Sequence, residues 1–107
     1  MNDVINALIT IENKFVFDIV KGVIEKKDEL DLIINKNMTK WKIERLAKTD
    51  QAILRIATYE IFFTETPDIV CINEAIELSK IYSDDKVKNL INGVLDSVLK
   101  EKENTNN

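Results

Sequence analysis

The segment over residues 50–64 reads DQAILRIATYEIFFT, and it decides which fold this chain can adopt. Its apolar residues fall on most sides of a helix, which is the pattern of a helix buried in the middle of a bundle. Thr49 precedes it as a predicted N-cap, and Asp50 then lies in the first turn, where negative charge is favoured. We therefore expect a central helix that other helices cover.

Amphipathic segments on both sides provide that cover. Apolar side chains step by three or four along residues 12–36, and again from Pro67 to about Tyr82 and along residues 84–99. Residues 2–9 have the same spacing over a shorter length. Ser83 is the predicted N-cap of the last helix. The helix before it is expected to bury Ile72, Ala75, Ile76 and Leu78.

The composition also favours helices. The chain has 107 residues, of which 45% are hydrophobic and 32% charged, and this balance fits one globular domain. Two Gly and one Pro are too few for a turn-rich β architecture. We predict an all-α fold, a small helical bundle over residues 1–100. Residues 101–107 read EKENTNN and have nothing to bury, so a disordered tail is expected.

Few residues could carry catalysis. The chain has no His, which removes the commonest general base and metal ligand. Its only cysteine, Cys71, stands in the apolar run IVCI and is interpreted as a small core residue rather than a reactive thiol. Acidic pairs such as Glu74 and Glu77 are interpreted as solvated helix faces. We expect no catalytic residue, no metal site and no cofactor.

Charge and hydropathy indicate a cytoplasmic protein that is not attached to a membrane. The net charge of −4 and the pI of about 4.9 argue against non-specific coating of nucleic acid. No segment reaches the roughly 18 apolar residues of a membrane span. The first residues lack the basic region of a signal peptide, and a single cysteine suits a reducing compartment.

The most basic segment spans residues 36–48, where five cationic side chains accompany one acid, Glu44. Trp41 is interleaved with them. Lysines bind phosphates as point charges, and an aromatic ring stacks on a splayed base, so this segment is a candidate RNA surface. In the alternative interpretation Trp41 is in the core or half-buried, and the lysines only keep the connector solvated.

Two glycines stand inside predicted helices, where each costs about 1 kcal/mol against Ala. Gly22 is interpreted as a point of close contact with a neighbouring helix. For Gly93 we also expect a close helix crossing, and Asn92 beside it is an alternative source of a specific polar contact.

Four blocks resemble the NusB family of bacterial transcription antitermination factors. They read WKIERL at 41–46, DQAILRIATYE at 50–60, INEAIELSK at 72–80 and INGVLD at 91–96, in the family's order and spacing. The resemblance implies two small helical bundles. It also implies binding to the boxA element of ribosomal RNA leaders, together with the ribosomal protein NusE, within the RNA polymerase antitermination complex.

The resemblance assigns roles unevenly to residues. Positions that face NusE in the family match Glu44, Asp50 and Arg55. The family has a basic residue and an aromatic one before the Asn-Gly pair, where this chain has Asn89 and Leu90. The expected RNA-binding residues are Lys40, Lys42, Lys86, Lys88 and Asn92.

The front of the chain departs from the family, whose members begin with an arginine-rich segment and helix. This chain has only two arginines, so the N-terminal bundle is expected to be incomplete, either through a mis-assigned start or in a genuine short form. Alternatives to an antitermination factor are a protein-only interaction module, a truncated remnant, or the leading domain of a ribosomal RNA methyltransferase. Self-association through the uncovered face of residues 12–34 is also expected.

Overall fold

The computed structural model describes residues 16–105, so the expectations for residues 2–9 and for the last two residues lie outside the described part. Residues 16–25 are helical and a turn at Lys26 leads into α2. The further elements are α2 (Lys27–Lys36), the 3-10 turn η1 (Ile43–Arg45), α3 (Lys48–Phe63), α4 (Asp68–Tyr82) and α5 (Asp85–Thr105). Residues 16–105 contain no strand, and the predicted all-α fold is confirmed.

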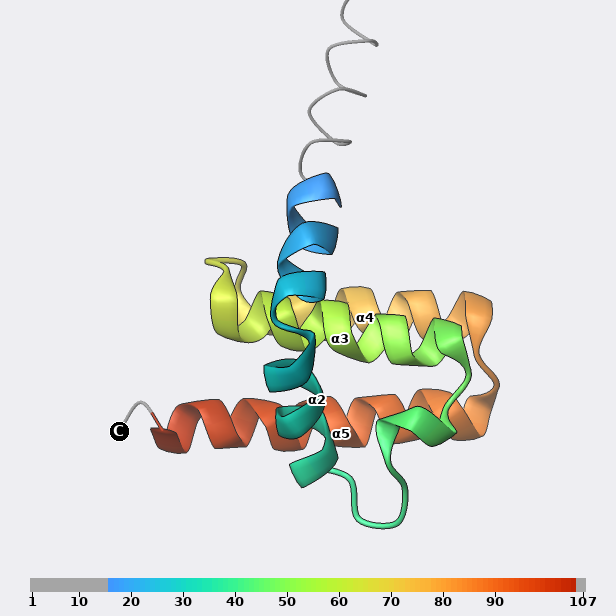
Figure 1. Cartoon of the computed structure of the whole chain (residues 1–107). Helices are drawn as coiled ribbons and strands as arrows, with labels where there is room; N and C mark the ends of the chain where they lie inside the picture. Colours follow the sequence, from blue (N-terminus) through green and yellow to red (C-terminus); the bar gives the residue numbers. More distant parts are fainter. Residues whose placement is uncertain (1–15, 106–107) are drawn as a thin grey trace, which may run out of the picture.

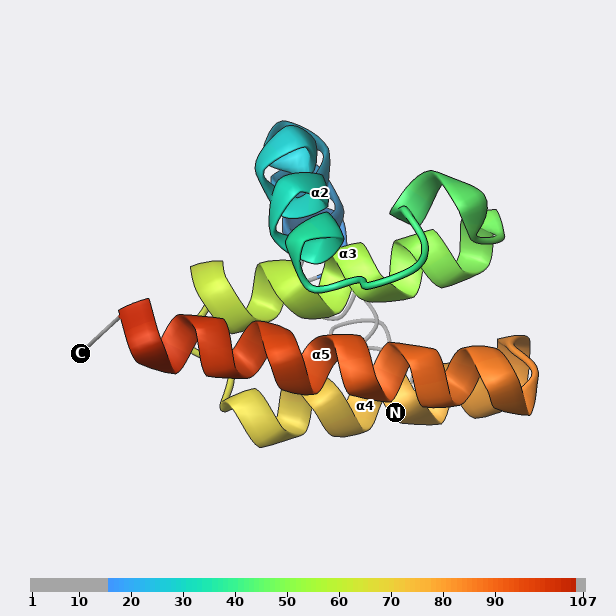
Figure 2. The ribbon, with the colours of Figure 1, turned by 90° about the horizontal axis from the view of Figure 1, so that it is seen from below.

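Three helices form the body of the molecule. Figure 1 shows α4 running antiparallel to α3, and α5 antiparallel to α4, while residues 16–25 and α2 run across them. Each of α3, α4 and α5 contacts the other two, and α2 contacts α3 and α5. Seen from below, the loop between α2 and α3 stands at the end of the bundle where α3 and α5 both begin (Figure 2).

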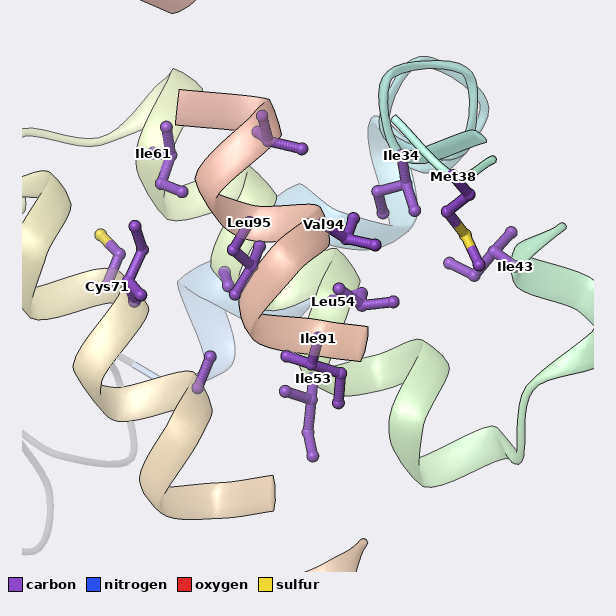
Figure 3. Close-up of a cluster of buried hydrophobic side chains, with 14 residues drawn as sticks. Ile34, Met38, Ile43, Ile53, Leu54, Ile61, Cys71, Ile91, Val94 and Leu95 are labelled. Atoms are coloured by element: carbon purple, nitrogen blue, oxygen red, sulfur yellow. The ribbon is translucent and has the colours of Figure 1, made fainter. Parts of the chain in front are cut away.

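The core is centred on α3, as the segment over residues 50–64 predicted. Leu54 and Ile61 of α3 are fully buried, and they belong to one cluster with Ile91 and Leu95 of α5. Ile34, Met38 and Ile43 extend the same cluster to α2 and the following loop (Figure 3). Burial of each such side chain contributes roughly 1.5–3 kcal/mol to the stability of the fold. The helix with apolar residues on most of its sides therefore takes the central position.

The helix starts differ from the predicted caps. Thr49 lies inside α3, which begins at Lys48 with Ala47 before it and no side-chain cap. At the start of α5, Asp84 takes the capping role, because its Oδ1 accepts the backbone N–H of Val87 at 2.9 Å. The hydroxyl of Ser83 donates instead to Asp50 on α3. The predicted cap residue, Ser83, therefore makes a tertiary hydrogen bond and does not cap α5.

The tail prediction is wrong for residues 101–105, because α5 continues to Thr105. Two ion pairs tie these turns to other helices. Lys36 of α2 lies 3.2 Å from Glu101, and Lys102 lies 2.8 Å from Asp68 of α4. A segment without apolar residues is thus held by charges from elements distant in the sequence.

Helix α4 corrects one further expectation. Ile72 and Ala75 are buried and Ile76 packs at the core's edge, but Leu78 is 38% exposed. The inward position is taken by Ser79, which is fully buried and whose hydroxyl donates to the carbonyl of Ile76 at 2.8 Å. A small residue there lets neighbouring helices approach closely.

Glu60 of α3 is buried although it carries a carboxyl group, with only 6% of its surface exposed. Burial raises its pKa, and the negative charge of Glu74 on α4 raises it further. An acid with a raised pKa in the folded state contributes its full stability at low pH. That contribution is lost as the pH rises through the folded-state pKa.

Glu60→Gln is therefore expected to raise the free energy of unfolding by about 1 kcal/mol at pH 7 and by much less at pH 4. Urea denaturation at the two pH values measures both differences. Glu77→Gln on the exposed side of α4 is the matched control, with an expected change within about 0.5 kcal/mol. A variant less stable than wild type at pH 7 would contradict this account.

Candidate nucleic-acid interface

Residues 37–47 link α2 to α3, and hydrogen bonds fix the shape of this loop. The backbone N–H of Ile43 donates to Oδ1 of Asn35 on α2 at 2.8 Å. From α3, Nε2 of Gln51 donates to the carbonyl of Leu46 at 2.9 Å. Met38 and Ile43 anchor the loop in the core. The loop therefore presents its remaining side chains in a defined arrangement.

Trp41 lies on the outside of this loop, with 53% of its surface exposed. Trp41 is not part of the core cluster, to which this loop contributes Met38 and Ile43, and its position is the half-buried one that the alternative interpretation allowed. Because hydrogen bonds fix the loop, the exposed part of this large aromatic side chain is available to a ligand.

Two hollows meet at Trp41. The larger, of about 570 Å³, lies between the loop and the start of α5 and is called here the Trp41 groove. It is lined by Trp41, Arg45, Leu46, Ala47, Asp50, Asp84, Lys86, Val87 and Leu90. The smaller, of about 380 Å³, is lined by Lys40, Trp41, Lys42 and Arg45. Both hollows share Trp41 and Arg45, so a ligand can contact the indole and the guanidinium from either side.

The charge around these hollows is predominantly positive, in a chain whose net charge is −4. Four cationic side chains line them, against the carboxylates of Asp50 and Asp84. Both carboxylates already accept hydrogen bonds within the chain, Asp50 from Ser83 and Asp84 from Val87. Asp50 thereby links α3 to the residue before α5 and Asp84 caps α5, while the cations are exposed to solvent.

The structure brings together only part of the predicted RNA site. Lys40, Lys42 and Lys86 lie around Trp41. Lys88 and Asn92 line neither hollow, because two and six residues beyond Lys86 correspond to about 200° and 240° around a helix. Helical geometry therefore divides the predicted set between two faces of α5.

The predicted partner-binding residues are also divided. Glu44 is exposed on η1, and the residue after it, Arg45, lines the Trp41 groove. Asp50 lines that groove but is only 5% exposed. Arg55 lies elsewhere, with its guanidinium turned to α2: Nε and Nη2 donate to the two carboxylate oxygens of Asp31 at 2.7 and 3.0 Å. This ion pair joins helices within the chain.

Sequence reasoning did not select Arg45 as a binding residue. It also missed the apolar wall that Val87 and Leu90 provide. Leu90 stands where the family has an aromatic residue, and in the structure it lines the groove. Arg45 and Lys86 line the same groove because of the irregular conformation of the loop. The spacing of apolar residues in the sequence does not predict that conformation.

The cysteine of this chain lies in the core, as the sequence predicted. Cys71 is buried, as predicted, and burial together with the nearby charges of Glu60, Asp68 and Glu74 raises its thiol pKa to about 11. The thiol therefore stays protonated near neutral pH.

Within residues 16–105, no cluster of three His, Cys, Asp or Glu residues is placed to hold a metal ion. No helix in that range combines the length and apolar content that crossing a bilayer requires.

Comparison with known proteins places the chain in a family. The NusB family model matches residues 1–100. The transcription antitermination protein NusB of Lactococcus lactis is 52% identical over 83 residues, covering 77% of this chain and 43% of that protein. The protein of the same name from Macrococcus caseolyticus is 39% identical over 104 residues and covers 95% of this chain and 80% of its own length.

A solved structure agrees. NusB of T. maritima superposes with a TM-score of 0.74 at 36% identity, over 78% of this chain and 60% of that one. The chain spans 43% and 65% of the Lactococcus lactis and Clostridium novyi relatives, so it matches only part of their length. The family match over residues 1–100, together with the all-α fold, shows that this chain belongs to the NusB family.

Proposed function

We propose that this chain acts in transcription antitermination as a non-catalytic factor that binds boxA-type leader RNA together with NusE. The observation that carries the proposal is the Trp41 groove, where an exposed indole shares one hollow with two cationic side chains, Arg45 and Lys86. Membership of a family whose relatives carry the name transcription antitermination protein supports the biological context.

The chemistry of the groove suits single-stranded RNA. Sequence-specific RNA recognition uses splayed bases that stack on aromatic side chains, and Trp41 offers such a surface. Stacking of one base contributes about 1–3 kcal/mol. Arg45, Lys86, Lys40 and Lys42 line the same two hollows, and their charges are proposed to neutralise the flanking phosphates. Lys88 and Asn92 lie off this groove, so a role for them in RNA binding rests on the resemblance alone.

NusE is proposed to bind beside the RNA. Glu44 is exposed on η1, and its neighbour Arg45 lines the groove, so an adjacent protein would contact both the loop and the nucleic acid. We propose Glu44 as the protein-facing residue and leave Asp50 as a support for the junction with α5. Arg55 is proposed to act on this surface only through the position of α2.

A protein-only interaction module is the second candidate. Two arginines in the whole chain and the negative net charge favour it, because phosphate neutralisation supplies much of the affinity for RNA. In that case NusE binds and RNA adds nothing to the complex.

The fluorescence of Trp41, the only tryptophan in the chain, provides the test. Stacking on a base is expected to quench its emission, so a titration with boxA RNA, with and without NusE, reports both partners. Lys86→Ala is expected to weaken RNA binding and lower the slope of log affinity against log salt by about 1. Lys100→Ala, an exposed lysine near the other end of α5, is the control and should leave both quantities unchanged.

Trp41→Ala is expected to weaken RNA binding about tenfold, whereas Trp41→Phe should retain most of it. For these variants a dye-labelled RNA replaces the tryptophan signal. NusE binding without any effect of RNA would favour the protein-only module. If neither NusE nor RNA binds the wild-type chain, the proposed function is wrong.

A further inference from the structure

The 3-10 turn η1 has a hydrogen-bonding group to satisfy at each end, and a side-chain amide from a different helix meets each of them. Backbone hydrogen bonds within the turn leave out the N–H of Ile43 at its start and the carbonyl of Leu46 at its end. Oδ1 of Asn35 on α2 accepts the first at 2.8 Å, and Nε2 of Gln51 on α3 donates to the second at 2.9 Å. We call Asn35 and Gln51 the amide pair.

The conformation of η1 depends on this pair. A 3-10 turn of three residues is too short to be stable by itself. The buried side chains of Met38 and Ile43 lie beside Ile34 and hold the loop against the core (Figure 3). Apolar burial has no preferred direction, so it fixes the depth of the loop but not its orientation. Hydrogen bonds are directional, and the amide pair orients η1 against α2 and α3 together.

Two residues of the Trp41 groove stand next to the positions that the pair holds. Trp41 precedes Ile43 by two residues, and Arg45 immediately precedes Leu46. Both line the groove, and both side chains are exposed. Because little of either side chain is packed against the core, the backbone of η1 determines where the indole and the guanidinium lie relative to each other.

We propose that Asn35 and Gln51 are positioning residues of the RNA site, an inference that rests on the proposed function. They hold Trp41 and Arg45 in the RNA-binding arrangement before RNA arrives, so that none of the binding free energy is needed to order the loop. Gln51 is only 4% exposed and acts through η1 without touching the RNA.

The first test measures motion of the indole in the chain without RNA. Trp41 is the only tryptophan, so time-resolved fluorescence anisotropy reports this loop on the nanosecond timescale. Asn35→Ala is expected to increase the amplitude of the motion, and Asn35→Asp, which keeps the acceptor oxygen, is expected to restore the wild-type value. Gln51→Met, which keeps the length of the side chain but not its donor, is expected to behave like Asn35→Ala.

Asn37→Ala is the matched control, because Asn37 is also an amide at the end of α2. Its Nδ2 donates to the carbonyl of Ile33 at 2.8 Å, and its Oδ1 accepts the hydroxyl of Ser97 on α5 at 2.6 Å. Neither bond involves η1, so the motion of Trp41 is expected to stay at the wild-type value. Circular dichroism verifies that every variant remains helical. Equal effects of Asn35→Ala and Asn37→Ala would indicate general loosening of α2 and overturn the proposal.

The second test measures affinity for dye-labelled RNA in the presence of NusE. Asn35→Ala and Gln51→Met are each expected to weaken RNA binding about tenfold, and Asn37→Ala is expected to leave it unchanged. Wild-type affinity in both amide-pair variants would refute the positioning role while the proposed function stands. A wild-type chain that binds no RNA would refute the proposed function and this role with it.

Discussion

Asp31→Asn is expected to lower the free energy of unfolding by about 3 kcal/mol, although Asp31 stands in no motif of the sequence. The reason is the Arg55 guanidinium, which donates to both oxygens of Asp31. The side chains of Asp31 and Arg55 are only 13% and 15% exposed. Loss of the carboxylate therefore leaves a largely buried positive charge without its counter-ion. Urea denaturation at pH 7 measures the difference.

The effect has a defined pH dependence. Burial by itself would raise the pKa of Asp31, but hydrogen bonds and charges from Arg55 and Lys27 outweigh it and lower the pKa below its ordinary value of 3.8. Stability from such a group is complete above the unfolded-state pKa and is lost as the pH falls through the folded-state pKa. The difference between wild type and Asp31→Asn should stay constant from about pH 5 to 8 and shrink below about pH 4.

Two further variants separate the ion pair from its surroundings. Lys27 also contacts Asp31, at 3.2 Å, but its side chain is 54% exposed, so Lys27→Ala should cost less than about 1 kcal/mol. Replacing both partners, Asp31→Leu with Arg55→Met, is expected to recover most of the loss, because no unpaired charge remains. Equal losses for Asp31→Asn and Lys27→Ala would show that the Arg55 pair is not the cause.

The ion pair also connects to the candidate site. It fixes α2 against α3, and α2 carries Asn35, whose side chain holds the N–H of Ile43 and thereby the loop that presents Trp41. The Asp31→Asn variant is therefore expected to bind RNA more weakly even where it is fully folded.

Gly22→Ala is expected to destabilise the chain by about 2 kcal/mol, whereas Gly93→Ala should stabilise it by up to about 1 kcal/mol. A Cβ at Gly22 would overlap the hydroxyl and ring of Tyr59, so the predicted close contact of this glycine is confirmed. The Tyr59 ring stacks on Phe63 with 5.5 Å between centroids, which limits how far it can move. A Cβ at Gly93 meets nothing within 4 Å, and only the helix propensity changes.

A double-mutant cycle identifies the contact responsible. In a Tyr59→Leu background the overlap is removed, and Gly22→Ala should then cost less than about 0.5 kcal/mol or become favourable. Thermal and urea unfolding of the four proteins give the coupling energy. If Gly22→Ala is equally harmful in both backgrounds, contact with Tyr59 does not explain the glycine.

The two glycines show the limit of sequence reasoning. Both interrupt helical patterns, and both were predicted to mark close helix crossings. The prediction holds for Gly22, which faces α3, and is wrong for Gly93, which is exposed on α5. Helix propensity reports that a glycine is unfavourable in a helix, but it does not report which side of the helix meets a neighbour.

The sequence by itself determined the helical class, the central position of α3 and the burial of Cys71, because apolar periodicity specifies which faces must leave water. The tertiary structure alone decided where isolated polar and aromatic residues went. It paired Arg55 with Asp31, turned Ser83 to Asp50, held residues 101–105 in α5 and put Trp41 beside Lys86. Such contacts join residues far apart in the chain, and their energies depend on distance and burial after packing, which no local pattern encodes.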